Sequence, residues 1–587
     1  MSRNTSSASY NSSEKIDNIK NDFVPGDPTG CARQRARWWM FLAIAACIVA
    51  AVTTSLLIWY TANMAVNQNG PDKTSPLRCG DKPTEKSLPC PRMPTVRPLP
   101  SPLPTELEDV LNHLNSTLTE MVDQNTSLPA ISANIFYRDS VLWSGHRGTK
   151  LLPIQDYSGP NGNTVYRIGS ISKIFTVLLL YRLFEDGLIG SIDDPLSKYI
   201  PEFSIRNPFT DDNITLREIA SQMSGLPREA PCIYHCEGTN SIEQLAILRN
   251  RSLILPPWTM PSYSNLGYAL LGRLLTERVL NTTFEIWVQK EILGPLEMEN
   301  TGFEIKSEVK RNTAFPYGNN RQRVPFSSIG WANPAGGMYS SINDLTKLGM
   351  MFTRPSKQRV FKASTVREMA LPIDVAPDGR TLWGSPFEME RSNGFLMRQK
   401  VGHIDTYDAY FSFVPELELG INVLISAKGF VKSDVKYATT FGQRAYDKLL
   451  PVLNKTLFKM DDSADFPINS KAFTGLYLVN QTNTVTLAKS SYYATISKSK
   501  SVLVFKAQSE QAFPFTIRYI GDLLTFRAKY LNPDMSCFAE RAGVFADLHF
   551  RQPHRKDGLS YGFTVPQWSI TARRMNNTAI AGEATPS

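Results

Sequence analysis

The sequence lacks the signatures of several common classes of protein. It has no dense run of Lys and Arg with interleaved aromatic residues, and a net charge of +9 is small for 587 residues, which argues against nucleic-acid binding. It contains no Gly-x-Ser-x-Gly segment, which argues against an α/β-hydrolase. Its composition has no strong bias, which excludes a fibrous or wholly disordered chain. At this length we expect two folded units joined by linkers.

Charge is missing from residues 38–60, an apolar run long enough to cross a hydrocarbon core. Three arginines flank its N-terminal side, whereas the C-terminal flank has no basic residue before Lys73. The positive-inside rule therefore predicts a retained transmembrane signal anchor, with a disordered cytosolic tail at 1–37 and the remaining chain extracellular or lumenal. The alternative is a cleaved signal peptide, but the long leading tail argues against it. Aromatic residues bracket the run in the manner of a membrane belt: Trp38, Trp39, Trp59 and Tyr60.

Proline recurs over residues 61–104 and predicts an extended, semi-rigid stalk that holds the folded part away from the membrane. Acceptors for N-glycosylation follow the stalk, as expected for a glycoprotein ectodomain. They lie at Asn115, Asn125, Asn213, Asn250, Asn281, Asn454, Asn480 and Asn576. Asn4 and Asn11 in the predicted cytosolic tail match the same pattern, so these acceptors support the orientation without deciding it.

Cysteine is scarce, and its spacing suggests disulfides rather than a metal site. Of the seven, Cys31 lies in the tail and Cys47 in the predicted span. The close pairs Cys79/Cys90 and Cys232/Cys236 are candidates for disulfides, which leaves Cys537 unpaired. Metal binding by Cys232, His235 and Cys236 is the alternative, but no fourth ligand lies nearby. We predict no metal and no cofactor.

Two patterns divide the predicted ectodomain. Residues 105–455 place strand-like segments at both ends of a long helical middle, which predicts an α/β fold: a mixed sheet flanked by helices, with a helical insert. Residues 466–570 alternate in short strands with Ser, Asn and Gly turns, which predicts a small all-β domain before a disordered tail at 571–587. The strands expected in the first unit are 131–137, 141–145, 395–401, 410–414 and 419–425, with helices at 105–122 and 432–450.

A candidate nucleophile stands at the start of an apolar helical run. A helix beginning at Ser170 brings Ser170 and Lys173 to neighbouring positions on one face, with the hydroxyl at the helix N-terminus. A serine with an amine within reach is a starting point for nucleophilic catalysis. The spacing is weak by itself, because Ser-x-x-Lys recurs at Ser307 and Ser497, and a helix cap with a solvated lysine is the plain alternative.

A second polar pair follows at Tyr263 and Asn265. Two residues apart on a turn, their polar ends can point the same way. A tyrosine near a lysine can shuttle a proton, and the amide can orient a substrate carbonyl. Tyr-x-Asn also recurs elsewhere in the chain, so a tyrosine packed at a turn remains the alternative.

Taken in order, these segments resemble the serine β-lactamase and penicillin-binding-protein superfamily, and especially its membrane-anchored animal members. The resemblance covers about residues 125–450 and rests on the order and spacing of several motifs. They are Arg167-Ile168-Gly169-Ser170-Ile171-Ser172-Lys173, Met223-Ser224-Gly225-Leu226-Pro227, Tyr263-Ser264-Asn265-Leu266-Gly267-Tyr268, Gly294-Pro295-Leu296 and Pro334-Ala335-Gly336-Gly337-Met338. The resemblance implies the β-lactamase/transpeptidase-like fold.

It also implies roles for single residues. Ser170 becomes the acylating nucleophile, Lys173 its proton acceptor, Tyr263 the proton relay and Asn265 the group that holds the substrate amide. The third motif of the family is a Lys or His, then another residue, then Gly, on a strand that lines the site. We match it to His403-Ile404-Asp405, with the N–H of Thr406 and that of Ser170 forming the oxyanion hole.

In this alignment Asp405 replaces the family's glycine, and Asp408 adds a second carboxylate. Negative charge near a developing oxyanion opposes catalysis unless the carboxylates point away or are paired. Two hypotheses therefore stay open. One is a membrane-anchored serine hydrolase that cleaves an amide or ester of a small molecule or peptide through an acyl-enzyme. The other is a catalytically inactive ectodomain that binds a ligand or partner.

Overall fold

A computed structural model describes the chain in two folded parts. The described residues are 93–124, 128–150, 159–232, 236–318, 322–427, 429, 436–463, 470–483, 486–499, 502–508, 515–519, 524–530 and 547–575. The predicted cytosolic tail, the span at 38–60 and most of the predicted stalk lie outside them, as do Cys79, Cys90, His235 and Cys537. In the part that the structure describes, no helix is both long and apolar enough to cross a membrane.

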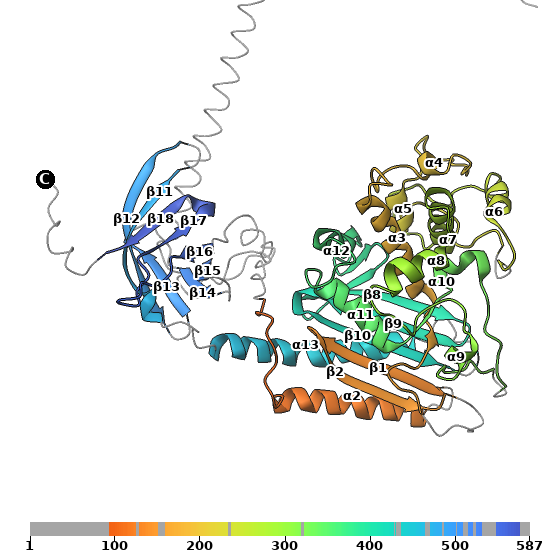
Figure 1. Cartoon of the computed structure of the whole chain (residues 1–587), viewed down its shortest axis with the longest axis horizontal. Coiled ribbons are helices and arrows are strands. Elements are labelled where there is room, and N and C mark those ends of the chain that lie inside the picture. The colour runs from red at the N-terminus through yellow and green to blue at the C-terminus, as the bar shows by residue number, and fades with distance from the viewer. Residues whose placement is uncertain are drawn as a thin grey trace, which may run out of the picture. The chain divides into compact units, whose positions relative to one another are not determined.

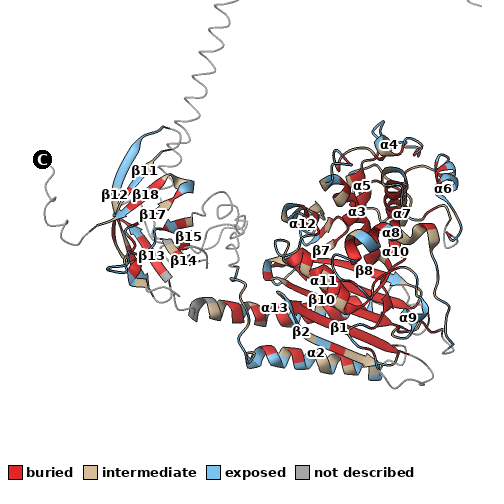
Figure 2. Cartoon of the chain, in the orientation of Figure 1, coloured by how far each residue is buried: buried red, intermediate tan, exposed pale blue. Residues whose placement is uncertain are grey.

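An eight-stranded antiparallel sheet organises the first part (Figure 1), with the strand order β2-β1-β10-β9-β8-β7-β6-β5. Chain segments from both ends of the domain meet in it, because β1 pairs with β10. The central strands are buried along their whole length, as the red colour of Figure 2 shows. The strands are β1 Ala130–Tyr137, β2 Ser140–Gly148, β5 Pro372–Val375, β6 Thr381–Gly384, β7 Glu388–Ser392, β8 Phe395–Ile404, β9 Tyr407–Val414 and β10 Leu419–Ser426.

Helices cover both faces of this sheet. On one face lie α2 (Thr105–Gln124) and α13 (Tyr437–Ser463); α2 buries leucines three or four residues apart, as an amphipathic helix requires. On the other face α11 (Ile342–Thr353) packs against the sheet, within the larger core that also contains α3 (Lys173–Glu185) and α7 (Asn265–Leu274). The short strand β3 (Tyr166–Arg167) pairs with β4 (Tyr339–Ser340). Directly after β3 the chain enters the 3₁₀ turn η1 at Gly169–Ser172.

The helical insert supplies the rest of this second layer. Its helices are α4 Leu196–Tyr199, α5 Leu216–Ala220, α6 Ser241–Leu248, α8 Phe284–Val288, α9 Ser307–Lys310, α10 Asn333–Gly336 and α12 Ala363–Met369, with π-helical turns at Leu275–Val279 and Gln289–Leu293 and a 3₁₀ turn at Gly330–Ala332. Side-chain caps begin several of them: Thr215 forms a capping box with Glu218, and Ser264 accepts from the N–H of Gly267 at the start of α7.

The second part is a closed barrel of eight antiparallel strands, in which the first strand pairs with the last. Aromatic rings fill its interior: Phe473, Tyr477, Phe526, Phe550 and Phe563 contact one another. A barrel of this size is just wide enough to be filled by side chains, so the interior is a packed core. The strands are β11 Gly475–Thr482, β12 Lys489–Ser499, β13 Val502–Ala507, β14 Phe515–Tyr519, β15 Thr525–Tyr530, β16 Asp547–Phe550, β17 Gly562–Val565 and β18 Ile570–Arg574.

Three expectations need correction. The large sheet is antiparallel between all of its described strands, not mixed. The helix after Gly169 begins at Lys173, because Ser170 lies in the preceding 3₁₀ turn. Finally, residues 93–104 do not form a free stalk: Val96, Leu99 and Leu103 pack against the core beside α2 and α13, and the Tyr137 hydroxyl donates to the carbonyl of Arg97.

A buried hydrogen-bonded triad ties α11 to the sheet and gives a stability prediction. The Thr346 hydroxyl accepts from the amides of Asn134 on β1, at 2.8 Å, and Asn422 on β10, at 3.2 Å. Thr346→Val keeps the shape but leaves two buried amide donors without this acceptor. We expect a loss of roughly 1–3 kcal/mol in the free energy of unfolding, measured by denaturant titration. Thr210→Val, in an exposed loop, is the control; equal losses for both variants would contradict the role of the triad.

Candidate active site

The structure brings Ser170, Lys173, Tyr263 and Asn265 together. The Lys173 amine is fully buried, 3.0 Å from the Ser170 hydroxyl, 2.7 Å from Asn265 Oδ1 and 2.7 Å from the carbonyl oxygen of Ala335. Burial in the first place, and the charge of Lys400 in addition, lower the pKa of Lys173 below its ordinary value. A neutral amine has two hydrogens, which Asn265 and Ala335 accept, so its lone pair is left to face the Ser170 hydroxyl.

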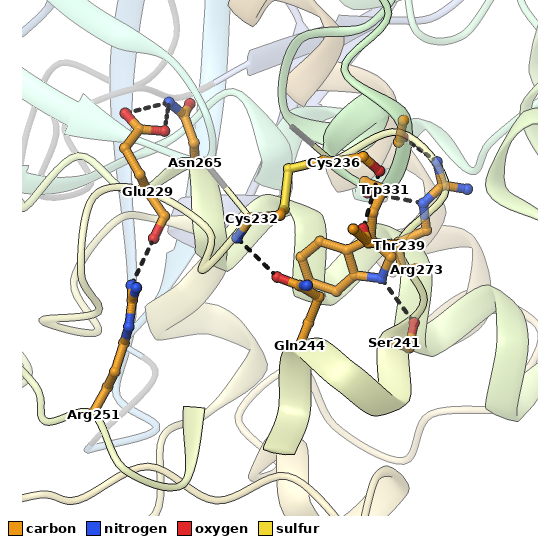
Figure 3. The surroundings of a disulfide bond; sticks show 11 residues. Glu229, Cys232, Cys236, Thr239, Ser241, Gln244, Arg251, Asn265, Arg273 and Trp331 are labelled. Carbon is orange, nitrogen blue, oxygen red and sulfur yellow. Dashed lines mark hydrogen bonds between the residues drawn. A yellow bond between two sulfur atoms is a disulfide. The ribbon is translucent and has the colours of Figure 1, made fainter. Parts of the chain in front are cut away.

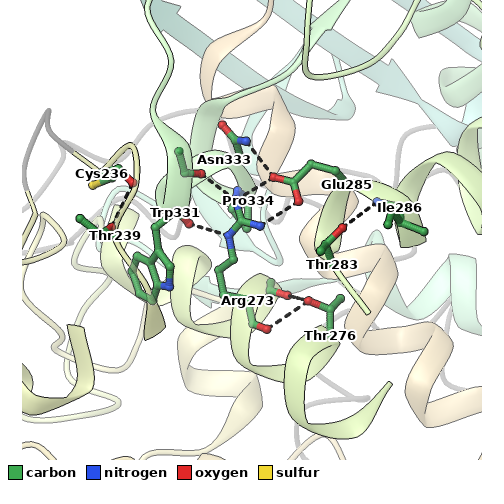
Figure 4. Close-up of polar contacts among 12 residues, drawn as sticks. Cys236, Thr239, Arg273, Thr276, Thr283, Glu285, Ile286, Trp331, Asn333 and Pro334 are labelled. Atoms are coloured by element: carbon green, nitrogen blue, oxygen red, sulfur yellow. Dashed lines mark hydrogen bonds and ion pairs between the residues drawn. The ribbon is translucent and has the colours of Figure 1, made fainter. Parts of the chain in front are cut away.

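The carbonyl of Ala335 is held in place by the polar network of Figure 4. Arg273 on α7 forms a two-pronged ion pair with Glu285 on α8, at 2.7 and 2.8 Å, and also donates to the carbonyls of Gly330 and Trp331. Glu285 in turn accepts from Asn333, the first residue of α10. Burial opposes ionisation of Glu285, but Arg273 lowers its pKa below the ordinary value. The network therefore fixes α10, and with it the acceptor for Lys173.

A second buried lysine stands beside Tyr263. Lys400 Nζ lies 5.2 Å from the centre of the Tyr263 ring, and Lys173 Nζ lies 4.8 Å from it. Lys400 forms an ion pair with Glu388 on β7. Although burial opposes the charge, Glu388 and Tyr263 raise the pKa of Lys400, so this lysine stays protonated. Burial would raise the pKa of Tyr263, but the two lysines together lower it.

Strand alternation separates Lys400 from His403. Successive side chains of β8 point to opposite faces of the sheet. Val401 packs on the face covered by α2 and α13. His403 follows it two residues later on this face and lies 3.1 Å from Asp408, which also accepts from the N–H of Ala438 at the start of α13. The His403 side chain therefore faces away from Lys173, and the Asp408 carboxylate lies on that far face as well.

The two other residues of the predicted third motif lie in the turn after β8. Asp405 accepts from the Ser327 hydroxyl at 2.5 Å and interacts with the charge of Arg167, so this carboxylate is paired. Thr406 is buried, and its carbonyl accepts from Ala427. The structure thus brings neither Thr406 nor the His403 side chain to Lys173, and the alignment of the third motif was displaced.

Lys400-Val401-Gly402 fits the third motif three residues earlier: a lysine, another residue and a glycine on a strand that lines the site. Gly402 is required by close packing, since a β-carbon there would clash with the carbonyl of Ile168 and lie 3.1 Å from the Ser170 nitrogen. Gly169, with φ of +48°, also packs on the backbone of His403 without room for a β-carbon. The expected glycine is present after all, and the apparent substitution by Asp405 was an error of register.

Asn265 has a further partner that the motifs did not indicate. Its Nδ2 donates to both carboxylate oxygens of Glu229, at 3.0 and 2.9 Å (Figure 3). Glu229 precedes its partner Asn265 by 36 residues, and Glu388 precedes its partner Lys400 by 12. No local sequence pattern marks either glutamate. Only the folded chain identifies them as neighbours of the site.

Two other features lie apart from these residues. A cavity of about 910 Å³ is lined by residues that include Arg167, Glu285, Phe326 and Asn333, but not by Ser170, Lys173 or Tyr263. Cys232 and Cys236 form a disulfide, as one of the two expectations had it, so their sulfurs are not metal ligands. No cluster of three metal-binding side chains occurs among the residues that the structure describes.

Comparison with known proteins identifies the family of the chain. The Beta-lactamase family profile matches residues 116–440, more than half of the chain. The chain belongs to the beta-lactamase family. The human protein beta-lactamase-like 1 is 33% identical over 395 residues, covering 66% of this chain and 77% of the relative. This membership supports a hydrolase at the level of broad class.

Solved structures share the fold. An octameric penicillin-binding protein homologue from Pyrococcus abyssi matches with a TM-score of 0.50 and 19% identity, covering 79% of this chain and all of that one. A class C beta-lactamase matches with a TM-score of 0.51 and 18% identity, covering 61% of this chain and 99% of that one.

The close approach of β8 to the serine turn gives a prediction. In Gly402→Ala the new methyl group pushes β8 and the Ser170 turn apart, so the rate of covalent labelling of Ser170 by a fluorophosphonate is expected to fall about 100-fold. Gly190→Ala is the control, because a β-carbon there meets only ordinary contacts. Equal labelling of both variants would show that this approach does not position the serine.

Proposed function

We propose that this protein is a serine hydrolase that cleaves an amide or ester through an acyl-enzyme at Ser170. The observation that carries the proposal is the position of the Lys173 amine. Its two other hydrogen bonds go to acceptors, and burial lowers its pKa, so it is suited to take the proton of the Ser170 hydroxyl.

The remaining groups have roles in the same reaction. When Ser170 attacks the carbonyl carbon, negative charge develops on the carbonyl oxygen. The N–H of Ser170 is one donor for it. The N–H of His403 is the other donor. Like the N–H of Val401, it points toward the β7 side of β8, and β7 no longer pairs with β8 there. The backbone of His403 also packs next to Gly169, directly before the serine. Tyr263, with a lowered pKa, passes the proton of Lys173 to the leaving group. Water then releases the acyl group.

The rival hypothesis, an inactive binding module, loses its main support. It rested on Asp405 in place of a glycine and on two carboxylates near the oxyanion. Asp405 is paired with Ser327, Asp408 lies on the far face of the sheet, and Gly402 occupies the position where the backbone approaches Ser170.

We also propose, from the sequence features of residues 38–60, that the chain is anchored in a membrane with both folded parts on the extracellular or lumenal side. Protease protection of the full chain in sealed microsomes tests this orientation. Digestion of the folded parts by protease added outside intact vesicles would contradict it.

Covalent labelling tests the nucleophile. We expect a fluorophosphonate to modify the full-length protein at Ser170, with no labelling of Ser170→Ala, as mapped by mass spectrometry.

Lys400→Met is expected to slow labelling about 100-fold because a charged group near the reacting centre is lost. His403→Ala keeps its backbone N–H and is expected to lose far less. A larger loss of labelling rate in His403→Ala than in Lys400→Met would favour His403 as the residue of the third motif. Absence of labelling in folded wild-type protein would contradict the proposed nucleophile.

The pH dependence tests the role of Lys173. Only the neutral amine can accept the serine proton, so the labelling rate rises with pH as Lys173 loses its proton. Because its pKa is lowered, the inflection is expected below the ordinary lysine value of 10.5. In Lys400→Met the neighbouring positive charge is absent, so the inflection moves to higher pH. A rate–pH profile with the same inflection in both proteins would contradict this coupling.

A further inference from the structure

Both polar atoms of the Asn265 amide already have partners. Its oxygen accepts from Lys173, and its nitrogen donates to the two oxygens of Glu229 at 3.0 and 2.9 Å (Figure 3). The two hydrogens of an amide nitrogen diverge, so a single carboxylate takes one of them, shared between its two oxygens. In the resemblance this asparagine holds the substrate amide. Here the group presented next to it is a carboxylate, which only accepts hydrogen bonds.

The loop that carries Glu229 is fixed at several points. Arg251 donates to the Glu229 carbonyl at 3.4 Å, and the N–H of Asn265 donates to the carbonyl of Arg228 at 2.7 Å. Three residues after Glu229 comes Cys232, which is joined to Cys236 and whose N–H donates to Gln244. The carboxylate is therefore held in one position before a substrate binds.

The charge of Glu229 is only loosely compensated. Its side chain is one-third exposed (33%), and the cation paired with it, Arg228 at 3.2 Å, is 65% exposed. Such an exposed ion pair contributes little free energy, so an incoming cation can displace the guanidinium at small cost. Arg228 also lies over the Tyr263 ring, 5.0 Å from its centre, so its displacement uncovers the tyrosine as well.

We infer that Glu229 binds a protonated amine on the acyl group of the substrate, next to the carbonyl that Ser170 attacks. This inference rests on the proposed function and names its substrate class: esters or amides of amino-bearing acids. The ammonium group replaces Arg228 on the carboxylate while Asn265 holds that carboxylate in position. A neutral acyl group of the same size leaves the Arg228 pair intact, and an anionic one is repelled by Glu229.

Three esters of 4-methylumbelliferone test the inference on the full-length protein: the isosteric pair glycyl and propionyl, and the larger, anionic malonyl. We expect kcat/KM for the glycyl ester to exceed that for the propionyl ester about 10-fold or more, with the malonyl ester poorest; Ser170→Ala supplies the background. Glu229→Gln removes the charge and is expected to bring the glycyl-to-propionyl ratio close to one. Glu120→Gln, an exposed carboxylate on α2, is the matched control and keeps the wild-type ratio.

The outcomes separate the inference from the proposed function. Equal turnover of the glycyl and propionyl esters, a preference for malonyl, or a preference for glycyl that survives in Glu229→Gln overturns the inference alone. Labelling of Ser170 without turnover of any of the three esters overturns it too. If Ser170 is neither labelled nor required for turnover, the proposed function fails, and the inference fails with it.

Discussion

The buried amine of Lys173 is the group on which the arrangement of the site depends. Moving a charged ammonium out of water is costly unless it finds hydrogen-bonding partners. Here the partners come from separate segments: Ser170 in the turn η1, Asn265 at the start of α7 and Ala335 in α10. Each segment must be in position for the amine to be satisfied. The contacts of Arg273 and Glu285 that fix α10 therefore hold one acceptor of the Lys173 amine in place without touching the amine.

The second constraint is the close contact between the serine turn and strand β8. Backbone meets backbone at Gly169 and Gly402, with no room for a β-carbon at either residue. This contact places the N–H groups of Ser170 and His403 beside one another and leaves the edge of β8 free of β7 beyond Gln399. An open strand edge ordinarily invites pairing with another strand. In this protein the serine turn η1 packs against β8 at that edge.

Much of this could be predicted from the sequence, and the failures have definite physical causes. Alternating and apolar segments located five strands of the large sheet but missed β5, β6 and β7. The motifs of the family resemblance, rather than the spacings alone, selected the four residues that the fold brings together, Ser170, Lys173, Tyr263 and Asn265. The third motif was displaced because β8 is buried on both faces at most positions, so no alternation of polar and apolar residues marks which side chains share a face. His403 was chosen because it matches the histidine form of the family's third motif, whereas Lys400 stands in a run of mostly buried residues.

The two lysines show why burial and partners, rather than residue type, decide the chemistry. Lys400 has a carboxylate beside it and keeps its proton despite its burial. For Lys173, burial in the first place, and the positive charge of Lys400 in addition, lower the pKa. The same Ser-x-x-Lys spacing at Ser307 and Lys310 forms α9, a short helix with no buried residue. Lys310 is exposed there, so the fold does not withdraw its amine from water. The motif is suited to the proposed catalysis only where the fold withdraws the amine from water and leaves its lone pair facing the serine.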